Sequence, residues 1–345
     1  MYNPMSSMIR HAKRSPNDKL NILTFVSHER YEPTLALTGH NFFSIITEGT
    51  KTWKTEYSPV PDNYTIFQDS VPDFILNDVD LILSHNPFVH IPLAHKMGLH
   101  VPLLNIFHTM PPPGWNSENI PQQYRQMFDR CDHHVYISDF NKLSWGYNRG
   151  DVILHGIDTK LFTPPTCGCD EWGHSYGCSG NPDREAKILT VANDYINRDW
   201  CLGFSIWKEL AQNLPMHPVG DTPGLSKPTK DLAEMIQVYQ KSLIFLNTST
   251  ASPVPMSLLE AMACGCACVS AATCLIPDVI EHGVDGFLCS PSKPEQFKKY
   301  CQQLLNDKDM AIQMGQKARE KIQTMFSLDN FIENWNSMFR KVLWQ

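Results

Sequence analysis

The sequence predicts a parallel α/β protein built from two domains, and three observations support this. Its 345 residues exceed what one hydrophobic core usually organises. Short apolar runs, typical of buried parallel strands, alternate with helical segments along most of the chain. A segment rich in Gly, Pro and Cys, residues 163–185, interrupts this alternation near the middle. We therefore expect two domains of similar architecture joined by this segment.

Composition and charge narrow the class of protein. The formal net charge is −7 and the isoelectric point is about 6.0, which disfavours a protein that binds nucleic acid mainly through a basic surface. No apolar run approaches the roughly 20 residues that cross a bilayer, and residues 1–19 lack the apolar core of a signal peptide. Several of the eleven cysteines lie in apolar runs, so reduced thiols are expected. We expect a cytoplasmic protein.

The first domain is expected over residues 20–162, after a flexible polar tail over residues 1–19. Its strands are expected at Asn21–Val26, Asp80–Ser84, Val101–Phe107, His134–Ile137 and Val152–Leu154. Polar residues follow several of these strands: His28, Glu29 and Arg30 follow the first, and His85 and His108 end later ones. Because ligands of doubly wound sheets bind at the carboxyl ends of the strands, these five residues are candidate ligand contacts.

The second domain is expected over residues 186–326, followed by a terminal helix over residues 327–345. A strand at Leu243–Leu246 leads through a rigid Ser252–Pro255 elbow into a short helix that carries one acid, Glu260. The first amides of a helix have no intrahelical partner and the dipole is positive there, so this helix start is suited to phosphate. Glu260 lies about two turns further on, where a carboxylate can accept hydrogen bonds from a sugar diol. The pattern indicates a site for a nucleotide or nucleotide sugar.

The connecting segment contains four potential metal ligands in the pattern C-x-C-x4-H-x3-C. They are Cys167, Cys169, His174 and Cys178. Zinc takes thiolate and imidazole ligands tetrahedrally, so a structural zinc site that staples this loop is one interpretation. The alternative is a loop with free thiols, because the spacing is not a standard zinc signature.

Two groups of motifs, taken together, resemble family 4 glycosyltransferases. The first is Glu260-Ala-Met-Ala-Cys-Gly265 with the later Ile276–Ile280 and Asp285–Leu288 segments; the second is His155-Gly-Ile-Asp158 with Phe162. The resemblance implies the GT-B fold: two Rossmann-like domains facing each other across a cleft, with the C-terminal helix crossing back to the first. It also implies a retaining, metal-independent hexosyl- or pentosyltransferase that uses a nucleoside-diphosphate sugar and needs no cofactor.

The resemblance also assigns roles to individual residues. Glu260 matches the family's glutamate that holds the donor ribose, and Arg198 falls where the family has a lysine that neutralises the diphosphate. His108 matches the histidine that the family places beside the transferred sugar. Asn193 stands where a second diphosphate-binding arginine is usual, and it is a candidate donor contact.

The sequence departs from the family at the start of the donor helix. Ser252 replaces the first glutamate of the family's pair, and Pro253 and Pro255 replace a glycine-rich turn, which removes two amide donors. The remaining candidate phosphate donors are the backbone amides of Val254, Met256, Ser257 and Leu258. The contacts to the donor sugar are therefore expected to differ from those of relatives.

The expected function is transfer of a sugar from a nucleoside diphosphate to a hydroxyl acceptor, with a cell-surface glycan precursor as the default. One alternative is a bacteriophage enzyme, acting in the host cytosol, that glycosylates hydroxymethylated bases in DNA; the acidic charge disfavours this. Others are a nucleotide-sugar epimerase and a non-catalytic nucleotide-sugar-binding module, the latter suggested by Ser252. The sequence leaves the donor base, the sugar and the oligomeric state open.

Overall fold

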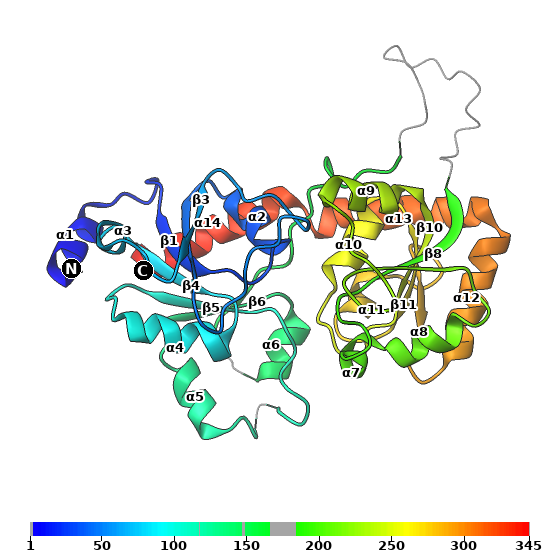
Figure 1. The fold of residues 1–345 in the computed structure, drawn as a ribbon, viewed down its shortest axis with the longest axis horizontal. Coiled ribbons are helices and arrows are strands. Elements are labelled where there is room, and N and C mark those ends of the chain that lie inside the picture. The colour runs from blue at the N-terminus through cyan, green and yellow to red at the C-terminus, as the bar shows by residue number, and fades with distance from the viewer. Residues whose placement is uncertain (1–2, 117, 147–148, 166–183, 345) are drawn as a thin grey trace, which may run out of the picture. The chain divides into compact units, whose positions relative to one another are not determined.

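The computed structural model describes residues 3–116, 118–146, 149–165 and 184–344. The chain divides into two compact units, Met1–Gly156 with Asp329–Gln345, and Ile157–Leu328. The boundary therefore falls after Gly156, before Phe162, where the first domain was expected to end. Each unit contains one parallel sheet with helices packed on it (Figure 1).

The first unit is built on a seven-stranded parallel sheet with the order β3-β2-β1-β4-β5-β6-β7. The strands are β1 (Asn21–Phe25), β2 (Asn41–Ile46), β3 (Tyr64–Gln68), β4 (Leu81–Ser84), β5 (Leu103–Phe107), β6 (His133–Tyr136) and β7 (Asp151–Val152). The helices are α1 (Pro4–Lys13), α2 (Tyr31–Ala36), α3 (Asp73–Leu76), α4 (Pro87–Met97), α5 (Gln122–Phe128), α6 (Asp139–Trp145) and α14 (Leu328–Trp344). Successive strand residues serve opposite faces: Ile22 packs in one core and Leu23 in the other.

Helix α14 covers one face of this sheet although it comes from the end of the chain (Figure 1). Its apolar residues recur at helical spacing, and Phe331, Trp335, Met338 and Phe339 are all buried in the core that contains Ile22. The C-terminal helix therefore belongs to the first unit. This part of the expected fold is confirmed.

The expectation of a flexible tail over residues 1–19 is wrong in its central part. Residues Pro4–Lys13 form α1, and Arg10 within it and Arg14 just after it both pair with the carboxylate of Asp80, at 3.2 and 2.8 Å. Asp80 is completely buried, and a buried carboxylate is retained only when its charge is paired. The tail is therefore ordered by an acid at the start of β4, distant in sequence.

The second unit is built on a five-stranded parallel sheet with the order β12-β11-β10-β8-β9. The strands are β8 (Glu185–Val191), β9 (Met216–Val219), β10 (Ser242–Asn247), β11 (Ala267–Ala271) and β12 (Phe287–Cys289). The helices are α7 (Asp199–Leu202), α8 (Phe204–Leu210), α9 (Leu232–Lys241), α10 (Met256–Ala263), α11 (Ile276–Val279), α12 (Pro294–Asn306) and α13 (Lys308–Met325). The expected α/β class with two Rossmann-like sheets is confirmed.

Two features of the sheets and helices were not expected. In sequence, strands β2 and β3 lie between the first two expected strands; β3 forms the edge of the first sheet and β2 is next to it, and half-exposed residues dilute their apolar pattern. The single helix expected near residues 201–213 is split at Gly203, whose φ is +70°. A Cβ at Gly203 would lie 2.1 Å from the carbonyl oxygen of Thr248, so the split lets the end of β10 approach closely.

Replacing Trp335 with Ala should lower the free energy of unfolding of the first unit by about 3–5 kcal/mol, because it empties a fully buried aromatic site. Urea unfolding followed by circular dichroism measures the change. The control is Leu143→Ala, whose side chain is 76% exposed and whose loss should cost about 0.5 kcal/mol or less. Equal effects of the two substitutions would contradict the assignment of α14 to this core.

Candidate functional site

Each sheet has one point where the strand order reverses direction, and ligands of such sheets bind beyond the carboxyl ends of the strands at that point. In the first unit the reversal lies between β1 and β4, and in the second it lies between β8 and β10. The expected site residues His28 and His85 follow β1 and β4, whereas Asn193 follows β8 and Ser252 follows β10. The candidate residues therefore collect at the two reversal points, one in each unit.

In the first unit, histidines from several strand ends form a cluster around Tyr31. His85 Nδ1 lies 2.9 Å from His108 Nε2, and the ring centroids of His28 and His108 are 4.4 Å apart. The Tyr31 ring contacts His108 edge-on at 4.6 Å and His155 at 5.6 Å. The structure thus brings together His28, His85 and His108 with His155 of the His155-Gly-Ile-Asp158 motif, and it adds Tyr31.

Burial keeps the histidines of this cluster neutral. It lowers the pKa of His85 to about 3 and the pKa of His28 and His108 well below the ordinary value of 6.5. Lys51 lowers the pKa of His28 further, and His28 does the same for His108. At neutral pH each ring therefore offers one N–H donor and one nitrogen acceptor, which suits hydrogen bonds to sugar hydroxyls.

Two amides of the turn after β1 are already used within the protein and are not open to a phosphate. The buried carboxylate of Glu32 accepts hydrogen bonds from the backbone amides of Ser27 and His28, both at 2.7 Å, and from the hydroxyl of Tyr64. An internal carboxylate thus occupies the place that an anion takes in a glycine-rich loop. Glu29 is also buried, and its carboxylate accepts from the amide of Lys54 at 3.2 Å.

The second unit holds the acid that the sequence predicted as the ribose ligand. Glu260 lies in α10, is 3% exposed, and its Oε2 accepts a hydrogen bond from the hydroxyl of Tyr239 at 2.9 Å. Tyr239 is fully buried near the end of α9, so its hydroxyl fixes the orientation of the carboxylate. Tyr239 is a site residue that the sequence did not predict. Its only signal was an aromatic residue just before the strand that leads into α10.

The start of α10 is less open than expected. The helix begins at Met256 with Pro255 as its N-cap, and the amide of Leu258 donates to Pro255 O at 3.1 Å. The expectation that the Leu258 amide binds phosphate is therefore wrong, because a tight first turn uses it. Within the described part of the chain, the amides of Met256 and Ser257 donate no hydrogen bond. They stay predicted phosphate donors, together with the amide of Val254. Ser252 is half-buried in the loop before them.

The loop after β8 is held by reciprocal hydrogen bonds with the loop after β9. The amide of Asp194 donates to Asp221 Oδ1 at 2.9 Å, and the amide of Asp221 donates to Asn193 Oδ1 at 3.1 Å. The Asn193 side-chain oxygen is thus engaged within the protein. Asp194 has a φ of +49°, and this sharp turn leads to Arg198, an exposed residue that starts α7. Asp221 was missed because its partners are distant in sequence.

Two cations stabilise the far end of α10. Arg319 donates to Ala263 O and also to Phe162 O and Thr159 O, both at 2.8 Å, while buried Arg184 donates to Cys264 O. Positive groups at a helix C-terminus complement its dipole and satisfy its last carbonyls. The anchoring ties α10 to the segment around Phe162, within the second unit.

The remaining predictions concern metal ligands, cysteine thiols and membrane-spanning helices. The expected zinc ligands Cys167, Cys169, His174 and Cys178 lie outside the described residues, and within those residues no three His, Cys, Asp or Glu side chains are grouped to hold a metal ion. The eight described cysteines are free thiols, seven of them buried. No helix among the described residues is long and apolar enough to cross a membrane.

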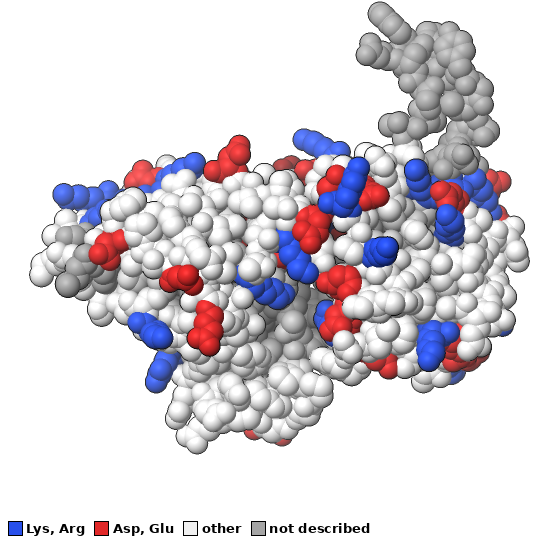
Figure 2. Space-filling model, in the orientation of Figure 1, with Lys and Arg blue, Asp and Glu red and all other residues white. Residues whose placement is uncertain are grey.

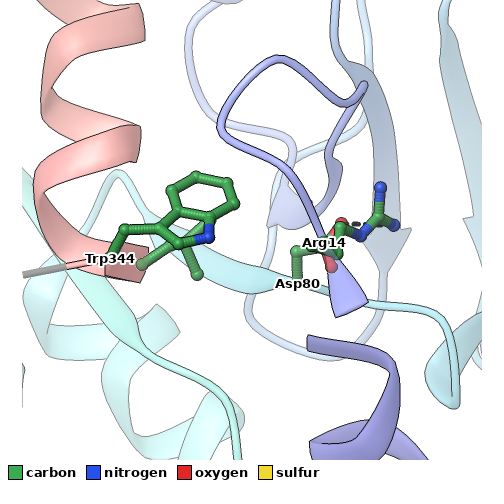
Figure 3. A pocket seen from close by; sticks show the side chains of 4 residues that line it. Arg14, Asp80 and Trp344 are labelled. Atoms are coloured by element: carbon green, nitrogen blue, oxygen red, sulfur yellow. Dashed lines mark ion pairs between the residues drawn. The ribbon is translucent and has the colours of Figure 1, made fainter. Parts of the chain in front are cut away.

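Other surface features lie apart from the candidate residues. A small pocket is lined by Arg14, Asp80, Leu343 and Trp344, at the amino end of β4 and so at the opposite edge of the first sheet (Figure 3). On the face shown in Figure 2, basic and acidic side chains are interspersed on both units, and no continuous basic surface appears there.

The neutral histidines predict a pH dependence of stability. A histidine whose pKa is lower in the folded than in the unfolded state binds fewer protons when folded. The free energy of unfolding should therefore fall as the pH drops below 6.5. The fall should continue to about pH 3, the pKa of His85 and His90 in the folded protein. Each histidine contributes about 1.4 kcal/mol per pH unit in this window. Urea midpoints between pH 7.5 and 4.5 measure the slope.

The matched variant for this measurement is His90→Asn. His90 Nδ1 accepts from the amides of His85 and Asn86 at 3.0 and 3.2 Å, and the Asn oxygen takes over this acceptance without titrating. The slope should become shallower. A slope as steep as in the parent protein would argue against a neutral His90.

Comparison with known proteins agrees with this arrangement. Residues 227–321 match the family "Glycosyl transferases group 1", a span that includes Tyr239 and Glu260. The N-acetyl-alpha-D-glucosaminyl L-malate synthase of Bacillus anthracis is 35% identical over 86 residues, which are 25% of this chain and 23% of that protein. An uncharacterized glycosyltransferase of Haemophilus influenzae is 29% identical over 172 residues, 44% of this chain and 48% of the relative. The chain thus matches less than half of the length of these curated relatives.

Solved structures share the fold over almost the whole chain. Anabaena HepE, in complex with UDP and glucose, has a TM-score of 0.71 at 15% identity and covers 93% of this chain and 99% of its own. A glycosyltransferase from Rickettsia africae has a TM-score of 0.62 at 17% identity, and the match covers 95% of this chain and 100% of the Rickettsia chain. Both likenesses concern the fold, because their identities are low. The chain thus has the GT-B fold of glycosyltransferases, and residues 227–321 of its second unit match the glycosyl transferases group 1 family.

Proposed function

We propose that this protein is a retaining glycosyltransferase that moves a sugar from a nucleoside-diphosphate sugar to a hydroxyl acceptor. The observation that carries the proposal is the buried Glu260, oriented by Tyr239 on a helix that begins beyond the carboxyl end of β10. Both residues lie inside the span that matches the glycosyltransferase family. A nucleotide-sugar site needs a diol acceptor and anion donors close together, and α10 supplies both.

The donor would bind across α10. The Glu260 carboxylate, oriented by the hydroxyl of Tyr239, would accept hydrogen bonds from the ribose hydroxyls. The amides of Met256 and Ser257, at the positive end of the helix, would face the diphosphate. UDP sugars are the first donors to test, since the Anabaena neighbour was solved with UDP-glucose and with UDP and glucose.

Departure of the nucleoside diphosphate develops negative charge, and Arg198 is the side chain proposed to stabilise it. Its loop is held by the reciprocal contacts of Asn193 and Asp221, so the guanidinium is presented from a rigid turn. A guanidinium is always charged and offers several donors in a fixed plane, which suits phosphate oxygens. Arg198 would thereby perform a task that a metal ion performs in other transferases. Asn193 would act mainly by positioning this loop.

The acceptor and the transferred sugar are proposed to contact the histidine cluster of the first unit. His108 would hydrogen-bond a hydroxyl of the sugar, and His28, Glu29 and Arg30 would line the acceptor side. Because Glu32 occupies the amides after β1, acceptor recognition there depends on side chains. A cell-surface glycan precursor remains the default acceptor.

Glu260→Gln should weaken UDP binding about 10- to 100-fold, because it removes the charge from a hydrogen bond to the ribose. Isothermal titration calorimetry with UDP measures the affinity, and the matched control is Glu281→Gln, an exposed acid in the same unit. UDP affinity that is equal in the parent protein and in Glu260→Gln would exclude Glu260 as the ribose ligand.

Arg198→Ala should lower kcat about 100-fold, because it removes a cation that stabilises the leaving diphosphate. Arg198→Lys should retain part of the rate. The assay follows UDP release from UDP-glucose, with and without sugar acceptors, and proton NMR of the product identifies the anomeric configuration. An α-linked product whose formation resists EDTA is expected. Conversion of UDP-glucose to a second nucleotide sugar without acceptor would instead identify an epimerase.

A further inference from the structure

The contact between His85 and His108 joins a buried ring to a partly exposed one. His85 is 3% exposed at the end of β4, and its Nδ1 lies 2.9 Å from Nε2 of His108, which follows β5. The two rings are nearly parallel, with an interplanar angle of 16°. No described residue makes a hydrogen bond to Nδ1 of His108, so this atom is left to face a ligand.

Hydrogen-bond accounting assigns the protons of the two rings. A neutral imidazole has one N–H and one acceptor nitrogen, and burial keeps both rings neutral, with the pKa of His85 at about 3. His85 Nε2 is buried and has no hydrogen-bond partner among the described residues. A proton on Nε2 would therefore be a buried, unsatisfied donor, which is rarer and costlier than an unused acceptor. The single proton of His85 is then placed on Nδ1.

The next ring along the chain is also restricted. His90 Nδ1 accepts hydrogen bonds from the amides of His85 and Asn86, so its own proton lies on Nε2. These two amides hold the turn after β4 and fix the backbone from which the His85 ring projects.

We propose that His85 is a positioning residue whose Nδ1–H donates to His108 Nε2 and thereby holds His108 in the tautomer that carries its proton on Nδ1. His108 then presents an N–H donor to the bound sugar and does not act as a base through Nε2. The role toward the sugar rests on the proposed function, whereas the tautomer is a property of the protein alone. Tyr31, packed against both rings, limits rotation of the pair.

The tautomer is tested directly by NMR. Long-range proton–nitrogen correlation spectra of the full-length protein with ¹⁵N-labelled histidine, at pH 7.5, distinguish a protonated Nδ1 from a protonated Nε2. The His108 signals are assigned from a His108→Gln variant. Protonated Nδ1 in His108 is the expected result. A proton on Nε2 of His108, with His85 protonated on its own Nε2, would overturn the proposal.

Two variants separate positioning from simple structural support. His85→Asn keeps an N–H donor at the position of Nδ1, so His108 should stay protonated on Nδ1. His85→Leu removes the donor, so His108 should shift toward the Nε2–H form. The control is His40→Gln, a half-buried histidine at the opposite edge of the sheet, which should change neither. An unchanged His108 tautomer in His85→Leu would refute the positioning role; if that variant does not fold, the parent and His85→Asn spectra decide.

The kinetic arm uses UDP-glucose as donor. His85→Leu should lower kcat about tenfold or more, which corresponds to the loss of one well-placed hydrogen bond, and should change KM little. His85→Asn should restore most of the lost kcat. Equal kcat for the parent protein and His85→Leu would overturn the role in catalysis. If the parent protein does not turn over UDP-glucose, the proposed function fails for this donor, and the NMR result still decides the tautomer.

Discussion

Burial of polar side chains at the carboxyl ends of parallel strands is the constraint on which this molecule depends. Each parallel sheet is covered on both faces, so the only open positions are at the strand ends, where polar groups must find partners or lose stability. In the first unit these groups are the histidines and Glu32. In the second unit they are Glu260 and the Asn193–Asp221 contacts. The hydrogen-bond partners of these polar groups determine which ligand groups each site can bind.

The two units satisfy this constraint differently. In the first unit these groups bind one another. Glu32 accepts hydrogen bonds from amides after β1, and His85 contacts His108 beside Tyr31. The Tyr31 hydroxyl in turn accepts a hydrogen bond from the indole of Trp335 at 3.1 Å. Helix α14 thereby supports the histidine cluster as well as the core. The second unit keeps the start of α10 available, while Arg184 and Arg319 satisfy its far end. The first arrangement suits neutral hydroxyl groups, and the second suits a diol joined to an anion.

Most of the fold was accessible from the amino-acid pattern, because strands buried on both faces are continuous apolar runs and helices show a regular period. Strands β2 and β3 were missed because several of their residues are only partly buried, which weakens the apolar pattern. The helix α1 was missed for another reason. Its order depends on the pairing of Arg10 and Arg14 with Asp80, and no local pattern reports a contact between such distant residues.

For the site, the linear pattern was sufficient to propose Glu260, Arg198 and His108 as candidates, because short motifs preserve their spacing along the chain. It was not sufficient for the residues that hold them. Tyr239, Asp221 and Trp335 act on partners 21 to 304 residues away, and that proximity arises only when parallel strands align their ends. Whether the amides after β1 and the amide of Leu258 can bind a ligand likewise depends on the tertiary structure. An amide is available only if no other group of the folded protein accepts its hydrogen bond.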